Sequence, residues 1–204
     1  MKVLIFGANG KTGKLVVEKA LAAGHTVTAF LRTAAEVPNV RVVTGDASDL
    51  TSVNAAMAGQ QAVIDTIGGK TPWKATTLER TAAGNIISAM QAASARRLIV
   101  VSMMGLGSSR PQAPFWYRSL LMTTFLHGST ADKTAMEAAV TASDLDYTIV
   151  RPPILTENAT TGSVLALTPP TKAHKITRAD LAQFLVDQIT GTQYLKQTVV
   201  IANN

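Results

Sequence analysis

Two kinds of apolar pattern alternate along the chain. Short continuous runs such as VLIF at residues 3–6 are typical of strands covered on both faces, whereas segment 76–94 carries apolar residues three and four positions apart, as one face of a helix does. The alternation predicts an α/β protein with a single domain over residues 1–204, built as a doubly wound, mostly parallel sheet with helices on both faces. Strands are expected at residues 3–6, 26–31, 40–44, 62–67, 98–102, 147–151 and 198–201, a short strand or extended loop at 164–167, and helices at 14–23, 49–58, 76–94, 130–142 and 177–189.

Helix ends carry their own signals. Asp49 and Thr177 precede two of the expected helices, and such side chains accept hydrogen bonds from amides of the first turn. Gly24 follows the helix at 14–23, where glycine commonly closes a helix. These residues fix the helix boundaries more firmly than periodicity alone.

Residues 103–129 interrupt the alternation with a long insertion rich in Met, Phe, Trp, Tyr and Leu. It leaves the carboxyl end of the strand at 98–102, and ligands of doubly wound sheets bind beyond such ends. We expect a substrate wall or lid; a short helix packed on the body, or a dimer contact, is the alternative. The side chains that could line a pocket for a flat ring, each of which is equally compatible with a place in the core, are Trp73, Met103, Met104, Phe115, Trp116 and Phe125.

The sequence GANGKTG at residues 7–13 lies between the first strand and the first helix. A Gly-rich turn in this position presents bare backbone N–H groups, and the helix N-terminus adds partial positive charge. The motif therefore predicts a diphosphate site of a Rossmann-like fold, with a tight turn that binds nothing as the alternative. The loop residues expected at the cofactor are Gly7, Asn9, Gly10, Lys11, Thr12 and Gly13.

Composition narrows the class of protein. A hydrophobic content of 47% over 204 residues indicates a globular domain, and no apolar stretch is long enough to span a bilayer. The chain has no cysteine, which excludes disulfides and fits a reducing cytoplasm, and its three histidines are isolated, so no metal site is expected. The formal charge of +6 comes from scattered Lys and Arg, which favours a basic cleft for anionic small molecules over a nucleic-acid partner.

The residues after the second strand indicate which dinucleotide binds. An acid there would favour NAD(H), but the strand at 26–31 is followed by Arg32, and a guanidinium suits a 2′-phosphate. Lys11 and Thr12 can add to the same phosphate, so NADP(H) is favoured over NAD(H). The alternatives are that Arg32 is an ordinary exposed arginine and that Asp46 is a simple turn aspartate. Further cofactor contacts are expected from Asp46 and Ala47 after the third strand and from Ile67, Gly68 and Gly69 at the end of the fourth.

Several stretches resemble the atypical short-chain dehydrogenase/reductases with an NAD(P)H-binding domain, and within them the biliverdin-IXβ reductase/flavin reductase type. The likeness rests on GANGKTG, on Gly45-Asp46 and on DKTAMEAAVTASDLDYTIVRPP at 132–153; segments 76–93, 159–164 and 174–190 extend it over nearly the whole chain. The resemblance implies a Rossmann-like fold, NADPH, and hydride transfer to flavins, linear tetrapyrroles or quinones. The same broad group also includes regulators that bind the nucleotide and catalyse no reaction.

The candidate catalytic residues depart from the pattern of most short-chain dehydrogenases. Most short-chain dehydrogenases place Tyr four residues before Lys on a helix, so that both face the nicotinamide. Here Lys133 stands at the expected position, but Ser129 occupies the place of the tyrosine, and Tyr117 lies too far away for helix geometry to bring it back. The usual proton donor for alcohols and ketones is therefore missing.

Three residues are the candidates for direct participation. The resemblance puts Ser102 near the nicotinamide, and Lys133 is expected to bind ribose or to steer anions; a satisfied strand-end hydroxyl and a solvated lysine are the alternatives. His127 can donate a proton, unless it is an exposed loop histidine. In the family the turn after the sixth strand borders the nicotinamide, which here means Pro152, Pro153 and Ile154.

Two functions follow from these observations. The first is an NADPH-dependent reductase of a flat aromatic acceptor such as a flavin, a biliverdin-like tetrapyrrole or a quinone, acting by orientation because water can supply the proton. The second is a non-catalytic NADP(H)-binding redox sensor of the nitrogen-repression-regulator type, which the missing tyrosine favours. A nucleotide-sugar epimerase fits poorly for the same reason. We expect a cytoplasmic monomer or weak homodimer with no membrane partner.

Overall fold

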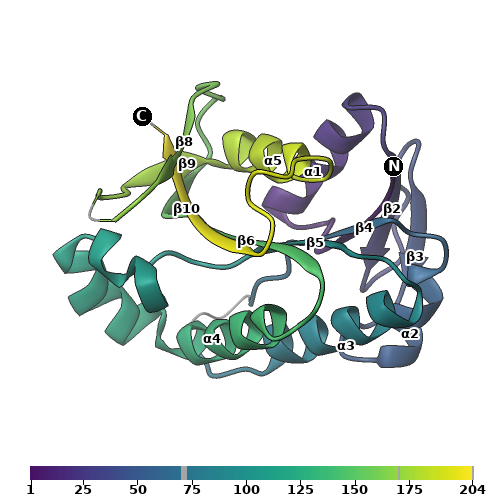
Figure 1. The fold of residues 1–204 in the computed structure, drawn as a ribbon, viewed down its shortest axis with the longest axis horizontal. Helices are drawn as coiled ribbons and strands as arrows, with labels where there is room; N and C mark the ends of the chain where they lie inside the picture. The colour runs from purple at the N-terminus through teal and green to yellow at the C-terminus, as the bar shows by residue number, and fades with distance from the viewer. Residues whose placement is uncertain (70–72, 170, 204) are drawn as a thin grey trace.

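A computed structural model describes residues 1–69, 73–169 and 171–203, and it contains an eight-stranded sheet (Figure 1). The strand order is β3-β2-β1-β4-β5-β6-β10-β8, and all neighbouring strands are parallel except β10 and β8. The strands are β1 (Lys2–Phe6), β2 (Thr26–Leu31), β3 (Arg41–Thr44), β4 (Ala62–Asp65), β5 (Arg97–Val101), β6 (Asp146–Arg151), β8 (Val164–Leu167) and β10 (Gln197–Asn203). The predicted fold class is confirmed.

Helices cover both faces of the sheet (Figure 1). On one face lie α1 (Lys11–Ala22) and α5 (Arg178–Asp187); on the other lie α2 (Leu50–Met57), α3 (Leu78–Ala92) and α4 (His127–Thr141). Alternate residues of β1 therefore enter two different cores: Val3 and Ile5 pack with α1 and α5, while Leu4 and Phe6 pack with α2, α3 and α4. This explains why the run at residues 3–6 carries no polar alternation.

The direction of chain winding reverses between β1 and β4. From β1 the chain runs outward to β2 and β3, then returns to β4 and continues through β5 and β6 in the opposite direction. Phe6 and Asp65 are paired at the ends of β1 and β4, so the Gly-rich loop and the segment after β4 start side by side. Ligands of such sheets bind at this reversal.

The two expected caps are confirmed. The carboxylate of Asp49 accepts hydrogen bonds from the amides of Thr51 and Ser52, both at 3.1 Å, and the hydroxyl of Thr177 accepts from the amide of Asp180 at 3.0 Å. Helix α1 begins at Lys11, three residues before the expected start at 14. The expectation followed apolar spacing, and the first turn of α1 is made of glycine and polar residues that carry no such signal.

A small second sheet was not expected from the sequence. Strands β7 (Ile154–Thr156) and β9 (Lys175–Thr177) pair in parallel beside the main sheet. The buried carboxylate of Asp180 holds this region together by accepting hydrogen bonds from Thr161, Thr177 and Asn203. Burial would raise the pKa of Asp180, but the hydroxyl and amide donors, from Thr160, Thr161 and Thr177, outweigh burial and hold it well below its ordinary value.

The insertion at 103–129 folds into two short helices beside the β10–β8 edge of the sheet (Figure 1). They are the 3₁₀-helix η1 (Gly107–Gln112) and the π-helix η2 (Tyr117–Phe125), which leads into α4. Met104 and Tyr117 form a third core cluster with Val200 and neighbouring alanines. Met104 is fully buried there, and its place in the expected substrate pocket stays a prediction.

Candidate functional site

The glycines of the loop after β1 are required by its shape. Gly7 has a φ of +71°, which L side chains rarely adopt, and a Cβ on it would lie 2.7 Å from Thr66 Oγ1. A Cβ on Gly13 would lie 2.1 Å from the carbonyl oxygen of Gly7, because α1 packs directly on the loop. Gly10 is exposed. The first and third glycines thus form the tight turn and the close helix–strand contact that a dinucleotide-binding loop needs.

The N-terminus of α1 is suited to an anion. Its cap residue is Gly10, which has no side chain to accept from the first amides, and the first turn contains no acidic residue. The amides of this turn are therefore free of the side-chain acceptors that satisfy most helix starts. A diphosphate would fit the loop, since its oxygens accept from such amides and its charge is favoured by the helix dipole.

Four side chains next to this loop form what we call the loop clasp: Lys11, Thr12, Glu157 and Arg178. Lys11 Nζ and Arg178 Nε both lie near the same oxygen of Glu157, Oε1, at 3.0 Å and 2.9 Å. Arg178 also donates to Thr12 Oγ1 at 3.1 Å. Arg178, followed by Lys11, lowers the pKa of Glu157 below its ordinary value. Lys11 and Thr12, expected at a 2′-phosphate, here contact residues of the C-terminal third.

The expected adenosine end lies at the tips of β2 and β3. Arg32 is exposed and makes no hydrogen bond or ion pair with another described residue. Asp46 is also exposed, and its Oδ1 accepts from the amide of Ser48 at 2.8 Å, as a turn aspartate does. Ala47 is nearly buried, and its carbonyl accepts from Asn85 Nδ2 at 2.9 Å. Arg32 therefore remains available for an anion, whereas part of Asp46 is committed to its turn.

Beyond the ends of β4 and β5 lies a group that we call the buried acid–lysine cluster: Asp65, Glu79 and Lys133. Lys133 Nζ lies 3.0 Å from Glu79 Oε1, and the two side chains are only 12% and 5% exposed. Asp65 closes β4 and accepts from the amide of Ile67 at 2.8 Å. Burial raises the pKa of Asp65 to about 6; the Ile67 amide and the charge of Lys133 oppose the rise, and the charge of Glu79 adds to it.

Two buried polar atoms at this end of the sheet lack partners among the described residues. They are Ser102 Oγ, just after β5, and Glu79 Oε2 in the buried acid–lysine cluster. A buried oxygen without a hydrogen bond is costly, so unpaired atoms of this kind often face a ligand position. Ile67, Gly68 and Gly69 follow β4, and the amide of Gly69 donates to Glu79 Oε1 at 3.3 Å.

Asp132 acts as the cap that α3 lacks in its own sequence. Its carboxylate accepts from the amides of Glu79 and Arg80, both at 3.0 Å, and from Thr76 Oγ1 at 2.8 Å. Because Asp132 precedes Lys133 on α4, this contact fixes α3 against α4. The Glu79–Lys133 pair is held between these two helices.

The described structure supplies no replacement for the missing tyrosine at 129. Tyr117 is buried in the third core cluster, where burial raises its pKa to about 12. His127 begins α4, is exposed, and places Nδ1 2.6 Å from the carbonyl oxygen of Thr124. No contact joins His127 to Ser102 or Lys133 among the hydrogen bonds and ion pairs of the described residues. Its role as a proton donor stays a prediction.

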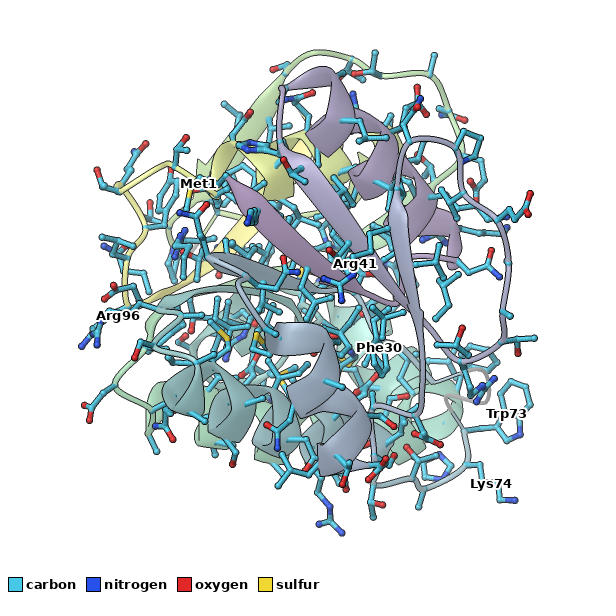
Figure 2. All side chains as sticks on the ribbon, turned by 90° about the vertical axis from the view of Figure 1, so that its right-hand side faces the viewer. Met1, Phe30, Arg41, Trp73, Lys74 and Arg96 are labelled. Carbon is cyan, nitrogen blue, oxygen red and sulfur yellow. The ribbon has the colours of Figure 1, made fainter. Side chains whose placement is uncertain are left out.

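The aromatic residues expected at a substrate pocket divide into two groups. Trp73 and Phe125 are about half exposed and meet with ring centroids 5.3 Å apart; Figure 2 shows Trp73 at the rim of the molecule. Trp116 packs edge-on against Tyr117 at 6.0 Å, and Phe115 is largely exposed. Met103 is almost buried. Trp73 follows β4 and Phe125 ends η2 in the insertion after β5, so the Trp73–Phe125 pair joins the segments that follow these two strands.

The turn after β6 is held from both sides. Pro152 and Pro153 are buried, the carbonyl of Pro152 accepts from the amide of Met104 at 3.0 Å, and Ile154 opens β7 with its side chain exposed. Arg151 forms a two-pronged pair with Glu137, at 2.8 Å and 2.6 Å, inside the body. Arg151 is therefore a structural residue, while the place of the prolines beside the nicotinamide stays a prediction.

Comparison with known proteins identifies the family. A model described as NAD(P)H-binding matches residues 7–192. The chain belongs to this NAD(P)H-binding family. It is similar to the UPF0659 protein YMR090W of Saccharomyces cerevisiae, with 28% identity over 100% of this chain and 93% of that protein.

Solved structures confirm the fold of this NAD(P)H-binding protein. The anaerobillin reductase ChuY of Escherichia coli O157:H7 superposes with a TM-score of 0.81 at 27% identity, covering 100% of this chain and 97% of that one. The oxidoreductase ylbE of Lactococcus lactis gives a TM-score of 0.83 at 22% identity, covering 100% and 91%. The chain has a Rossmann-like NAD(P)-binding fold. The nicotinamide dinucleotide class of the expected cofactor is confirmed, whereas the preference for NADP(H) over NAD(H) stays a prediction.

Neither a metal site nor a membrane-spanning helix is found among the described residues. No three His, Cys, Asp or Glu side chains among them gather as metal ligands would. None of the helices described here combines the length and apolar character needed to cross a bilayer.

Sequence reasoning missed four residues of the candidate site: Asp65, Glu79, Glu157 and Arg178. Asp65 carried a usable signal, since it is an acid ending an otherwise apolar strand at the reversal point. Glu79 and Arg178 lie in segments quoted for the family resemblance, and Glu157 lies outside those segments. Only the tertiary contacts give these three residues a place.

Proposed function

We propose that the protein is an NADPH-dependent reductase that transfers hydride to a flat aromatic acceptor, a flavin or a biliverdin-like tetrapyrrole. The observation that carries this proposal is the exposed Trp73–Phe125 pair, with ring centroids 5.3 Å apart. Large apolar rings exposed together commonly mark a binding surface, and they suit a planar partner that stacks. The likeness to ChuY, an anaerobillin reductase, supports the tetrapyrrole class.

The residues present fit chemistry that needs little acid catalysis. When bound, the reduced nicotinamide supplies the hydride. The glycine loop and the α1 N-terminus would hold the diphosphate, and Lys133 would meet the ribose from its place beside Glu79. Ser102 Oγ, buried without a partner among the described residues, would bond the carboxamide or the acceptor. The catalytic contribution of these residues is orientation of two planar groups, because an electron-poor ring accepts hydride without a strong enzymic acid.

Arg32 supports the choice of NADPH. It is an exposed guanidinium, unpaired among the described residues, at the end of β2 where the 2′ position of adenosine is expected. Arg32→Ala should weaken NADPH by about tenfold and leave NADH nearly unchanged, as expected for loss of one charge-assisted contact. Equal weakening of both coenzymes in a fluorescence titration would contradict the assignment.

The acceptor is tested by following oxidation of NADPH at its nicotinamide absorbance with FMN, and separately with biliverdin. Trp73→Ala and Phe125→Ala should raise KM for the acceptor several-fold and leave the Kd of NADPH unchanged, since each loses one face of stacking. Leu120→Ala is the matched control, because Leu120 is an exposed apolar residue of η2 outside the ring pair. Equal effects of all three variants would remove the support for a stacking surface.

A non-catalytic NADP(H) sensor is the second candidate. The observation favouring it is the burial of Tyr117 in the core, which leaves a serine, not a phenol, one turn before Lys133. Tight binding of NADPH without turnover of flavins, quinones or biliverdin is the result expected of a sensor. Steady turnover with either acceptor class decides for the reductase.

A further inference from the structure

We propose that Arg178 binds the diphosphate of the cofactor and that Glu157 occupies this position as an anionic stand-in until the cofactor arrives. The inference rests on the proposed NADP(H) cofactor and adds two residues that the glycine motif does not contain. It concerns the loop clasp, in which both residues contact the first turn of α1.

The clasp already has the donor arrangement of a phosphate site. Glu157 Oε1 accepts from Lys11 Nζ at 3.0 Å and from Arg178 Nε at 2.9 Å. Nη1 of the same guanidinium donates to Thr12 Oγ1 at 3.1 Å, inside the glycine loop. Two cationic donors that converge on one oxygen, next to a helix start that no described side chain caps, form the environment that a phosphate oxygen prefers.

The two partners in the clasp differ in how firmly they are held. The Arg178 side chain is 21% exposed and starts α5, whose cap Thr177 and buried Asp180 fix the backbone. Helix α5 lies alongside α1 on the same face of the sheet (Figure 1). The Glu157 side chain is 59% exposed and lies just beyond β7. Arg178 is therefore preorganised, whereas Glu157 can move into solvent.

Exchange of Glu157 for a diphosphate is favourable on electrostatic grounds. Ion pairs between exposed side chains contribute little, so release of Glu157 costs little. A diphosphate carries more negative charge than one carboxylate and also accepts from the loop amides, which the Glu157 side chain does not contact. Glu157 then acts as an internal competitor that weakens both coenzymes equally, in contrast to Arg32, which discriminates between them.

Titration calorimetry with NADPH, NADH and inorganic pyrophosphate tests the inference on the full chain. Arg178→Gln should weaken all three by about tenfold, the effect of losing one charge-assisted contact. Glu157→Gln should tighten all three by about threefold, since the competitor loses its charge while its size is kept. In the double variant the gain from Glu157→Gln should shrink, because its main partner is gone.

Arg96→Gln is the matched control. Arg96 is another exposed arginine in an ion pair, with Asp146 at 3.3 Å, and Figure 2 shows it on the side of the molecule opposite Trp73. Its replacement should leave every Kd unchanged. A far-ultraviolet circular dichroism melt of each variant checks that α5 is intact, so that a weaker Kd reports the contact and not the fold.

The outcomes separate this inference from the proposed function. If wild-type protein binds neither coenzyme, the proposed function fails. If wild-type protein binds them and Arg178→Gln binds equally well, only the role of Arg178 is refuted. Weaker binding by Glu157→Gln would refute the stand-in, because it would mean that the carboxylate supports the loop.

Discussion

Two charged groups flank the expected cofactor position, and they are built in opposite ways. The loop clasp joins an acid that is 59% exposed to Lys11 and Arg178, whereas the buried acid–lysine cluster joins an acid that is 5% exposed to Lys133. The distances within the pairs are nearly the same, about 3.0 Å in both. Only the surroundings differ.

Burial decides what each group can do. In water the attraction between two charges is weak and each charge is well solvated alone, so an exposed pair can exchange partners. Inside the protein each charge depends on the other, because an unpaired buried charge is strongly unfavourable. The clasp is therefore suited to ligand exchange, and the buried cluster to holding Lys133 in a fixed position whether or not a ligand is present.

The largest effect is expected from breaking the buried pair. Glu79→Ala leaves the Lys133 ammonium without its partner, and should lower the free energy of unfolding by about 4 kcal/mol, as for other buried pairs that lose one member. Urea denaturation at pH 7 measures it. Glu18→Ala, at an exposed glutamate of α1, is the control and should have almost no effect. A loss as small as that of Glu18→Ala would mean that Asp65 alone satisfies Lys133.

A somewhat smaller effect should appear as a pH dependence set by Asp65. Its pKa is about 6 in the folded protein against 3.8 as the ordinary value, so the folded state holds the proton more tightly than the unfolded chain. The free energy of unfolding should therefore fall as the pH rises from about 4 to about 6, by about 3 kcal/mol in total, and level off above. Lys133 and Glu79 are the charged groups that act on Asp65.

Asp65→Asn isolates this contribution from other carboxylates. The variant keeps an acceptor for the amide of Ile67 but does not titrate. The difference in unfolding free energy between wild type and variant should therefore change across this pH window. Parallel pH profiles for the two proteins would show that Asp65 keeps an ordinary pKa when folded.

Local signals explain why much of the fold could be predicted from the sequence. The uninterrupted run at residues 3–6, the glycines at 7 and 13 and the caps Asp49 and Thr177 each act over a few residues, and each is read directly from the chain. The order of strands and helices then leaves few topologies open. The same applies to the absent phenol, since Ser129 is visible one turn before Lys133.

Contacts between distant segments account for what could not be predicted. Lys11 and Glu157 are 146 positions apart, and the sequence around either residue gives no signal that the two side chains meet. Met104 lies in an apolar stretch that fits a pocket wall as well as a core, and its packing with Val200 is evident only in the folded chain. Strands β7 and β9 are three residues each, too short for a periodic pattern. Pairing, and with it the charge environment of the site, is a property of the folded chain.

Ser102 extends the comparison of the two charged groups to a neutral buried hydroxyl. Its buried Oγ has no partner among the described residues, so Ser102→Ala should raise the free energy of unfolding of the coenzyme-free protein by about 1 kcal/mol. The same variant should weaken NADPH or its acceptor if the hydroxyl serves the ligand. A loss of stability without coenzyme would show that the hydroxyl already has a partner.

The smallest effect on stability is expected from the clasp. Glu157→Gln should leave the urea midpoint unchanged at pH 7, because the carboxylate is exposed and its cationic partners remain solvated when it is neutralised. Glu157→Gln should therefore combine an unchanged urea midpoint with tighter binding of NADPH, whereas Glu79→Gln should lower the urea midpoint. A shift of similar size in both variants would mean that exposure does not distinguish the two groups, and the division of labour between an exchangeable and a permanent charge pair would have to be abandoned.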